Sequence, residues 1–148
     1  FKALIVISEE SNQRIVLPLH PRTKGKLETH LSEELRMKLI QSENILIIPP
    51  AGFLDIIALE KNSKMIVTDS GGLQKEAFFF EKPCIILRPQ TEWIEIVENG
   101  NAILVDADYN RILEAFNSLS AKNDFSYPTL YGDGKSAEFI CEQIIEYI

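Results

Sequence analysis

Basic residues are too few in this 148-residue chain to make it a general nucleic-acid binder. Fifteen lysines and arginines stand against 22 aspartates and glutamates, which gives a formal net charge of −7 and an isoelectric point near 4.9. A nucleic-acid-binding face needs a basic patch. A free nucleotide stays an acceptable ligand, because backbone amides and a few placed cations can hold its phosphates.

Long apolar runs and cysteine motifs are also missing. No apolar run reaches the roughly 18–20 residues that span a bilayer, and no signal peptide is visible, so we predict no association with a membrane. The two cysteines, Cys84 and Cys141, form no metal-ligand pattern. Each stands in an apolar run, which predicts buried, reduced thiols and a cytoplasmic protein.

Short apolar runs alternate with segments of helical spacing along the chain. The spacing of Phe1, Leu4 and Ile5 predicts the tail of a helix that began upstream, so we expect a fragment of a longer protein. The predicted strands are 14–17, 44–48, 65–68, 83–87 and 102–105, and the predicted helices are 27–35, 53–57, 71–80, 91–98, 109–119 and 137–148. Continuously apolar strands, each followed by a helix, predict an α/β fold whose parallel sheet has helices on both faces.

The most informative stretch is Val-Thr-Asp-Ser-Gly-Gly-Leu-Gln-Lys-Glu-Ala at residues 67–77. It predicts a strand end, a tight turn and a helix N-terminus, where the first N–H groups lack partners and the helix dipole is positive. Gly71 and Gly72 carry no Cβ, so a phosphate oxygen can approach their backbone closely. Glu76 follows about one and a half helical turns into the helix, where it can accept hydrogen bonds from sugar hydroxyls. Phosphate and sugar together indicate a nucleotide.

The same residues also fit a structural role alone. Two glycines between a strand and a helix often serve as a turn, and Asp69-Ser70 fits an N-cap pair. The pattern matches neither the dinucleotide-binding fingerprint nor the P-loop. From these residues by themselves, the two interpretations stay open.

Other polar clusters are expected at the same edge of the sheet. Ligands of parallel sheets bind beyond the carboxyl ends of the strands, and residues 20–23, 51–52, 69–72 and 88–92 all follow predicted strands. This convergence favours a phosphate or nucleotide site. The candidate cleft residues are His20, as a hydrogen-bonder rather than a catalyst, with Arg22, Arg88, Thr91 and Glu92. Arg88 either binds phosphate or pairs with Glu92.

Several motifs, in their order along the chain, resemble those of the non-hydrolysing UDP-N-acetylglucosamine 2-epimerases. They are Pro-Leu-His-Pro-Arg-Thr at 18–23, the stretch 68–77, Lys82-Pro83 with Arg88, Thr91-Glu92, and Tyr-Gly-Asp-Gly at 131–134. The resemblance covers nearly the whole chain. It implies that residues 1–148 are one Rossmann-like, UDP-binding, C-terminal domain. That domain is half of a two-domain architecture of the glycosyltransferase-B type, and the N-terminal domain is absent.

The resemblance also implies a reaction and its partners. The family inverts C2 of the sugar by eliminating UDP, which gives a 2-acetamidoglucal, and then adding UDP back, without cofactor or metal. Ser70, Gly71 and Gly72 match the family's diphosphate contacts, and Glu76 matches its ribose-binding carboxylate. The acid–base carboxylates lie in the N-terminal domain and a catalytic histidine lies upstream, so this chain alone is expected to be an inactive part of the isomerase. Expected partners are a UDP-sugar, the N-terminal domain and, for the full-length protein, a second copy, with no nucleic acid.

Three positions depart from the family pattern. Trp93 stands where many bacterial members have a nucleotide-contacting arginine, and Ala51 and Ile56 replace residues that flank the uracil in some members. A Thr-Glu-Trp sequence resembles relatives that act on modified sugars, such as UDP-diacetamido uronic acids. An epimerase of such a sugar is therefore one alternative. The donor-binding half of a glycosyltransferase and a non-catalytic Rossmann-like module are two others.

Overall fold

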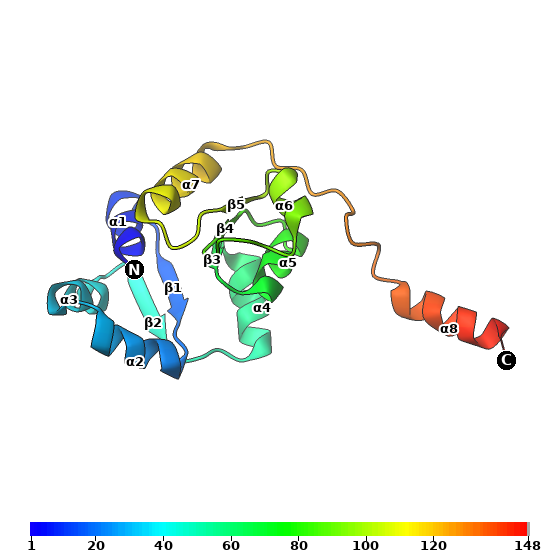
Figure 1. Cartoon of the computed structure of the whole chain (residues 1–148), viewed down its shortest axis with the longest axis horizontal. Helices are drawn as coiled ribbons and strands as arrows, with labels where there is room; N and C mark the ends of the chain where they lie inside the picture. The colour runs from blue at the N-terminus through cyan, green and yellow to red at the C-terminus, as the bar shows by residue number, and fades with distance from the viewer. Residues whose placement is uncertain (148) are drawn as a thin grey trace.

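Helices and strands alternate through residues 1–147, the part of the chain that the computed structural model describes (Figure 1). The strands are β1 (Ile15–Pro18), β2 (Ile45–Ile48), β3 (Ile66–Thr68), β4 (Cys84–Ile86) and β5 (Ala102–Leu104). The helices are α1 (Lys2–Glu10), α2 (Pro21–His30), α3 (Glu33–Gln41), α4 (Phe53–Asn62), α5 (Gly71–Phe79), α6 (Ile94–Glu98), α7 (Tyr109–Ala121) and α8 (Ser136–Glu146).

All strand pairs are parallel, as predicted, but they form two separate hydrogen-bonded sheets. One sheet is the pair β1-β2, and the other has the order β3-β4-β5. Within the described residues, no ladder joins the two sheets. They are connected by packing instead, because Ile15 of β1 lies against the same apolar cluster as Met65 and Val67.

Helices cover both faces of the three-stranded sheet, and the alternation of side chains along β4 explains how. Ile85 packs with residues of α1 and α7, such as Ile7 and Ala115. Cys84 and Ile86 point the other way and pack with Ala77 of α5 and with residues of α6. Successive strand residues face opposite sides of a sheet, so this short buried strand takes part in two cores.

The helix predicted over 27–35 is wrong in one respect, because the structure has two helices there. Leu31 takes an extended backbone conformation, with ψ of 141°. Ser32 then begins α3, and its side chain accepts a hydrogen bond from the Leu35 N–H at 3.4 Å. The leucines of the predicted stripe still share one cluster around Leu27 and Leu39. A local N-cap therefore ends the first helix without changing which residues face the core.

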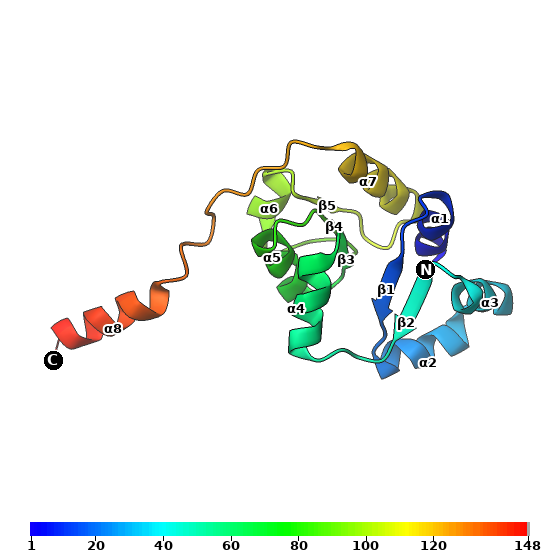
Figure 2. The same ribbon diagram turned by 180° about the vertical axis from the view of Figure 1, so that it is seen from behind.

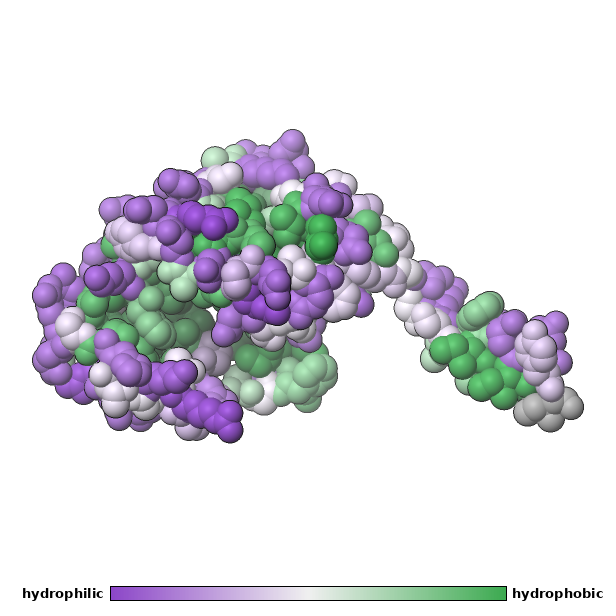
Figure 3. All heavy atoms as spheres, viewed as in Figure 1, coloured by the Kyte–Doolittle hydropathy of each residue, from purple (hydrophilic) through white to green (hydrophobic). Residues whose placement is uncertain are grey.

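Helix α8 stands away from the rest of the molecule at the end of an extended segment (Figures 1 and 2). It has no buried residue. Figure 3 shows hydrophobic residues, in green, on the surface of this protruding helix. The exposed ones are Phe139, Ile140, Ile144 and Ile145. Among the described helices, none is long and apolar enough to cross a bilayer.

The two cysteines differ in burial. Cys84 is buried with a free thiol, as predicted. The prediction is wrong for Cys141, which is free but exposed. The apolar spacing around Cys141 is helical, as predicted, but a buried position also needs a partner surface, and no residue of α8 is buried.

Candidate functional site

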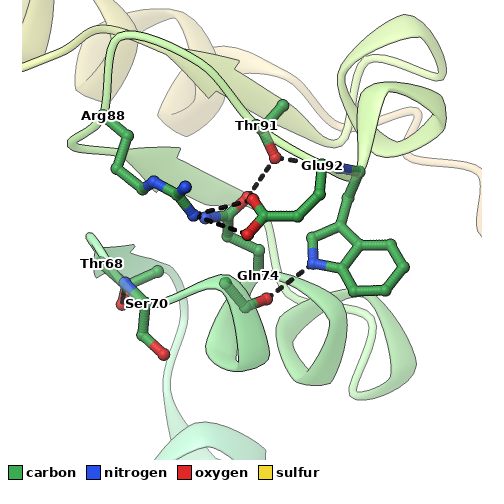
Figure 4. Close-up of polar contacts among 8 residues, drawn as sticks. Thr68, Ser70, Gln74, Arg88, Thr91 and Glu92 are labelled. Atoms are coloured by element: carbon green, nitrogen blue, oxygen red, sulfur yellow. Dashed lines mark hydrogen bonds and ion pairs between the residues drawn. The ribbon is translucent and has the colours of Figure 1, made fainter.

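The N-terminus of α5 is open to a ligand. Ser70 precedes it in an extended conformation, and the Ser70 N–H donates to Thr68 Oγ1 at 3.0 Å, which anchors the turn to β3 (Figure 4). No side chain caps the helix, so the predicted N-cap role of Ser70 lacks its side-chain hydrogen bond. The first N–H groups of α5 are left available at the positive end of the helix dipole, which suits an anion.

The two glycines are not required by the shape of the turn. Neither Gly71 nor Gly72 has a positive φ, so another residue could adopt the same backbone. A Cβ on Gly71 would lie 2.9 Å from Glu92 Oε1, while one on Gly72 would meet only Glu76 and Ser70, both at 3.8 Å. The backbone geometry thus gives no turn-forming reason for this pair. The absence of a Cβ at Gly71 leaves room for the Glu92 carboxylate, and Gly72 has open space beside it.

Glu76 lies on α5, where its Oε1 atom faces Gly72. Its side chain is half-buried. The helix therefore presents free N–H groups and, one turn further, a carboxylate on the same side. This is the spacing that the sequence predicted for a diphosphate next to a ribose.

Arg88 and Glu92 form an ion pair beside this helix end. Arg88 Nη1 lies 2.7 Å from Glu92 Oε2 and 3.1 Å from Oε1 (Figure 4). The pKa of the Glu92 carboxyl is held below its ordinary value. The larger cause is a hydrogen bond from the backbone N–H of Glu92, and the smaller is the hydrogen bond from the Arg88 guanidinium. The sequence left two roles open for Arg88, phosphate binding and pairing with Glu92, and the structure shows the pairing.

Two contacts that sequence reasoning missed tie the loop after β4 to α5. Gln74 is fully buried, and Thr91 Oγ1 donates to its Oε1 at 2.5 Å. The Trp93 indole N–H donates to the Gly71 carbonyl at 2.8 Å. A signal for Gln74 was present in the sequence. It stands three residues before Ala77, on the core-facing side of a helix, and a buried polar side chain there needs a hydrogen-bond partner.

Lys75, which sequence reasoning missed as well, brings a positive charge to the same place. The Lys75 ammonium lies 4.6 Å from the centroid of the Trp93 ring and 4.4 Å from that of Tyr131. Cations over aromatic faces are attracted by the ring quadrupole. Trp93 therefore packs in an aromatic cluster and also holds a cation close to the first turn of α5.

Replacing Trp93 with phenylalanine is expected to lower the free energy of unfolding by at least about 1 kcal/mol, because the N–H bond to Gly71 is lost and the smaller ring gives up part of the indole's contacts. Chemical denaturation measures this. Tyr109→Phe is the matched control, since the exposed Tyr109 side chain makes no hydrogen bond within residues 1–147. Equal stability of the Trp93 variant and wild type would mean that the indole bond contributes nothing.

His20 and Arg22 lie apart from this cluster, at the end of the β1-β2 sheet. His20 is the N-cap of α2, and its Nδ1 accepts a hydrogen bond from the Arg22 N–H at 3.2 Å. Both side chains are exposed. Within the described residues, no hydrogen bond or ion pair links either one to α5. The structure thus brings together Ser70, Gly71, Arg88, Thr91 and Glu92, and it leaves His20 and Arg22 outside that group.

The comparisons with known proteins agree on one family. A family model described as UDP-N-acetylglucosamine 2-epimerase matches residues 1–145. A UDP-N-acetylglucosamine 2-epimerase homolog of Methanococcus maripaludis is 42% identical over 133 residues, which are 90% of this chain and 36% of that protein. A UDP-2,3-diacetamido-2,3-dideoxy-D-glucuronate 2-epimerase of Pseudomonas aeruginosa is 42% identical over 130 residues, 88% of this chain and 34% of that protein.

Solved structures give the same result. The structure of UDP-GlcNAc 2-epimerase from Methanocaldococcus jannaschii matches 99% of this chain with a TM-score of 0.86 and 37% identity, and this chain covers 40% of it. A structure of that protein in complex with UDP-GlcNAc and UDP matches with a TM-score of 0.82 and 38% identity. Since this chain covers 36% and 34% of the two curated relatives above, it spans about a third of their length. In sequence and in fold, the chain belongs to the UDP-N-acetylglucosamine 2-epimerase family.

Proposed function

We propose that residues 1–148 form the UDP-binding domain of a UDP-sugar 2-epimerase, and that the whole protein converts UDP-GlcNAc to UDP-ManNAc. The observation that carries the proposal is the uncapped N-terminus of α5, with open space beside Gly72 and with Glu76 on the same side. Ser70, Gly71 and Gly72 are assigned to the diphosphate, and Glu76 to the ribose. Membership of the family supports both assignments.

The proposed reaction needs an anion site at the moment when UDP leaves. Elimination removes the proton from C2 and breaks the bond between C1 and the UDP oxygen, which gives 2-acetamidoglucal and UDP. Re-addition forms the C1–O bond again and returns a proton to the opposite face of C2. The N–H groups of Gly71 and Gly72 would stabilise the charge that develops on the departing diphosphate. Because the acid–base residues are assigned to the absent domain, this chain alone is expected to be inactive.

A second candidate is an epimerase of a modified UDP-sugar. Trp93 supports it, because it replaces an arginine common in bacterial members, and so does the similarity to the Pseudomonas aeruginosa protein. Both candidates share the UDP site and differ only in the sugar. Assays of the full-length protein with UDP-GlcNAc and with a UDP-2,3-diacetamido uronic acid separate them, since the better substrate has the larger kcat/KM.

An NMR titration of backbone amides tests the UDP site directly. We expect saturable shifts centred on Ser70, Gly71, Gly72 and Glu76, stronger with UDP than with uridine or pyrophosphate alone. If millimolar UDP causes no shifts in this chain, the titration is repeated with the full-length protein. Binding there would mean that the second domain supplies the missing affinity. No binding in either protein would overturn the proposal and favour a non-catalytic module.

Replacing Glu76 with alanine is expected to weaken UDP binding about tenfold, which is the typical cost of losing hydrogen bonds to a charged group. The loss should be smaller for 2′,3′-dideoxy-UDP, because this ligand offers no ribose hydroxyls. Calorimetry with both ligands measures the difference. Glu98→Ala, at an exposed glutamate of α6, is the control and should change neither affinity. Equal losses for the two ligands would contradict the ribose role.

We also propose partners and a location for the full-length protein. The exposed apolar side chains of α8 support packing of this helix on the N-terminal domain, since the solved relatives are more than twice as long. Phe79, 56% exposed, is a second apolar contact, either for that domain or for a second copy in a homodimer. The free, buried thiol of Cys84 supports a cytoplasmic location.

A further inference from the structure

Glu60 is a buried carboxyl that no side chain in the described part of the chain neutralises. It lies near the end of α4, is 4% exposed, and neither of its oxygens accepts a hydrogen bond. No ion pair involving Glu60 is found in residues 1–147. A buried carboxylate without a cation or a donor is costly, so such a group tends to keep its proton.

The neighbours of Glu60 explain its state. Its titratable neighbours are Glu76 from α5, at hydrogen-bonding range, and Cys84 from β4. Two ionised carboxyls have only acceptors, so Glu60 and Glu76 can share a hydrogen bond only if one of them carries a proton. Burial first, and then Glu76, raise the pKa of Glu60 to about 7. Burial and Glu60 raise the pKa of Cys84 to about 12, so the thiol stays neutral.

We propose that Glu60 is a positioning residue for the ribose site, where its protonated carboxyl donates a hydrogen bond to Glu76 and fixes that carboxylate facing Gly72. The inference rests on the proposed function of Glu76. Glu76 Oε1 already points toward the position of a Gly72 Cβ, at 3.8 Å. A carboxylate held in its binding conformation loses less freedom when the nucleotide arrives. Without the shared proton, two like charges lie together and Glu76 turns away from the ribose.

The consequence is that nucleotide binding depends on a proton that the nucleotide never touches. In the full-length protein, the affinity for UDP-GlcNAc is expected to fall about tenfold between pH 5.5 and 8.5. This ligand is chosen because its diphosphate does not ionise in that range, whereas free UDP does. Calorimetry at each pH gives the dissociation constants.

Variants of Glu60 separate the proton from the packing. Glu60→Gln keeps a donor at every pH, so it should bind as tightly as wild type at pH 5.5 and show no decline up to pH 8.5. Glu60→Leu has no donor and should bind weakly throughout. A decline in Glu60→Gln equal to that of wild type, or no decline in wild type, would overturn the positioning role.

A carbon-13 titration of the glutamate carboxyls adds a measurement that needs no ligand. The Glu60 resonance should titrate near neutral pH and move the Glu76 resonance with it, and both effects should disappear in Glu60→Gln. A Glu60 resonance that titrates in the ordinary range for glutamate would overturn the inference alone, with UDP binding intact. No binding of UDP-GlcNAc at any pH would overturn the proposed function, and the positioning role with it.

Discussion

Replacing Gly72 with valine is expected to weaken UDP binding at least about a hundredfold, or roughly 3 kcal/mol, and to leave the stability of the chain nearly unchanged. The reason is where the new methyl groups would stand. A Cβ at this position meets only Glu76 Oε1 and Ser70 Oγ, both at an ordinary 3.8 Å, so the ligand-free fold accommodates it. These two atoms belong to the residues assigned to the ribose and the diphosphate. The added side chain would therefore fill the place proposed for the nucleotide.

The backbone also favours this separation of binding from stability. Gly72 has no positive φ, and it lies in the first turn of α5, where any residue can adopt the helical conformation. Calorimetry with UDP and thermal melting measure the two effects. Gly25→Val is the matched control, since Gly25 lies in α2 and its Cβ would meet nothing within 4 Å. Unchanged UDP binding in Gly72→Val would exclude close approach of a phosphate at this turn.

Glu60→Gln is expected to stabilise the chain in a way that depends on pH. A glutamate that has a pKa of about 7 in the folded chain and 4.5 as its ordinary value binds more protons when folded, so stability falls as pH rises through this window. At pH values above this window, the ionised Glu60 lowers the free energy of unfolding of wild type by about 3 kcal/mol. The amide never ionises, so the variant should gain up to that amount at pH 8 and almost nothing at pH 4.

Urea denaturation across this pH range measures the gain. Glu98→Gln serves as the control, because Glu98 is exposed and its replacement should leave the dependence on pH unaltered. Curves of stability against pH that run parallel for wild type and Glu60→Gln would contradict a raised pKa for Glu60. In that case Glu60 would be ionised despite its burial, and the shared proton with Glu76 would be ruled out.

The start of α5 was predictable because its signals are local. A β-branched run, two glycines and helical spacing stand next to one another in residues 65–77, and the structure places β3, a turn and α5 there. The family resemblance rested in part on the same residues and is confirmed. Short-range patterns of this kind predict the local secondary structure and identify the motif.

Contacts between distant residues were beyond the reach of such patterns. Trp93 bonds to the Gly71 carbonyl across 22 positions, and no spacing rule connects the two. Glu60 lies beyond the predicted helix 53–57, and its burial depends on how α4 packs against its neighbours. The break between α2 and α3 is hidden for a different reason, because the leucine spacing continues through the N-cap at Ser32.

The unequal burial of the two cysteines makes the chain easy to label at one chosen position. Cys84 is buried and its pKa is raised to about 12, so it supplies almost no thiolate to an alkylating reagent at neutral pH. Cys141 is exposed on α8. A maleimide fluorophore should therefore attach to α8 alone, without any mutation. Its emission would then report, in real time, whether another protein surface has covered this helix.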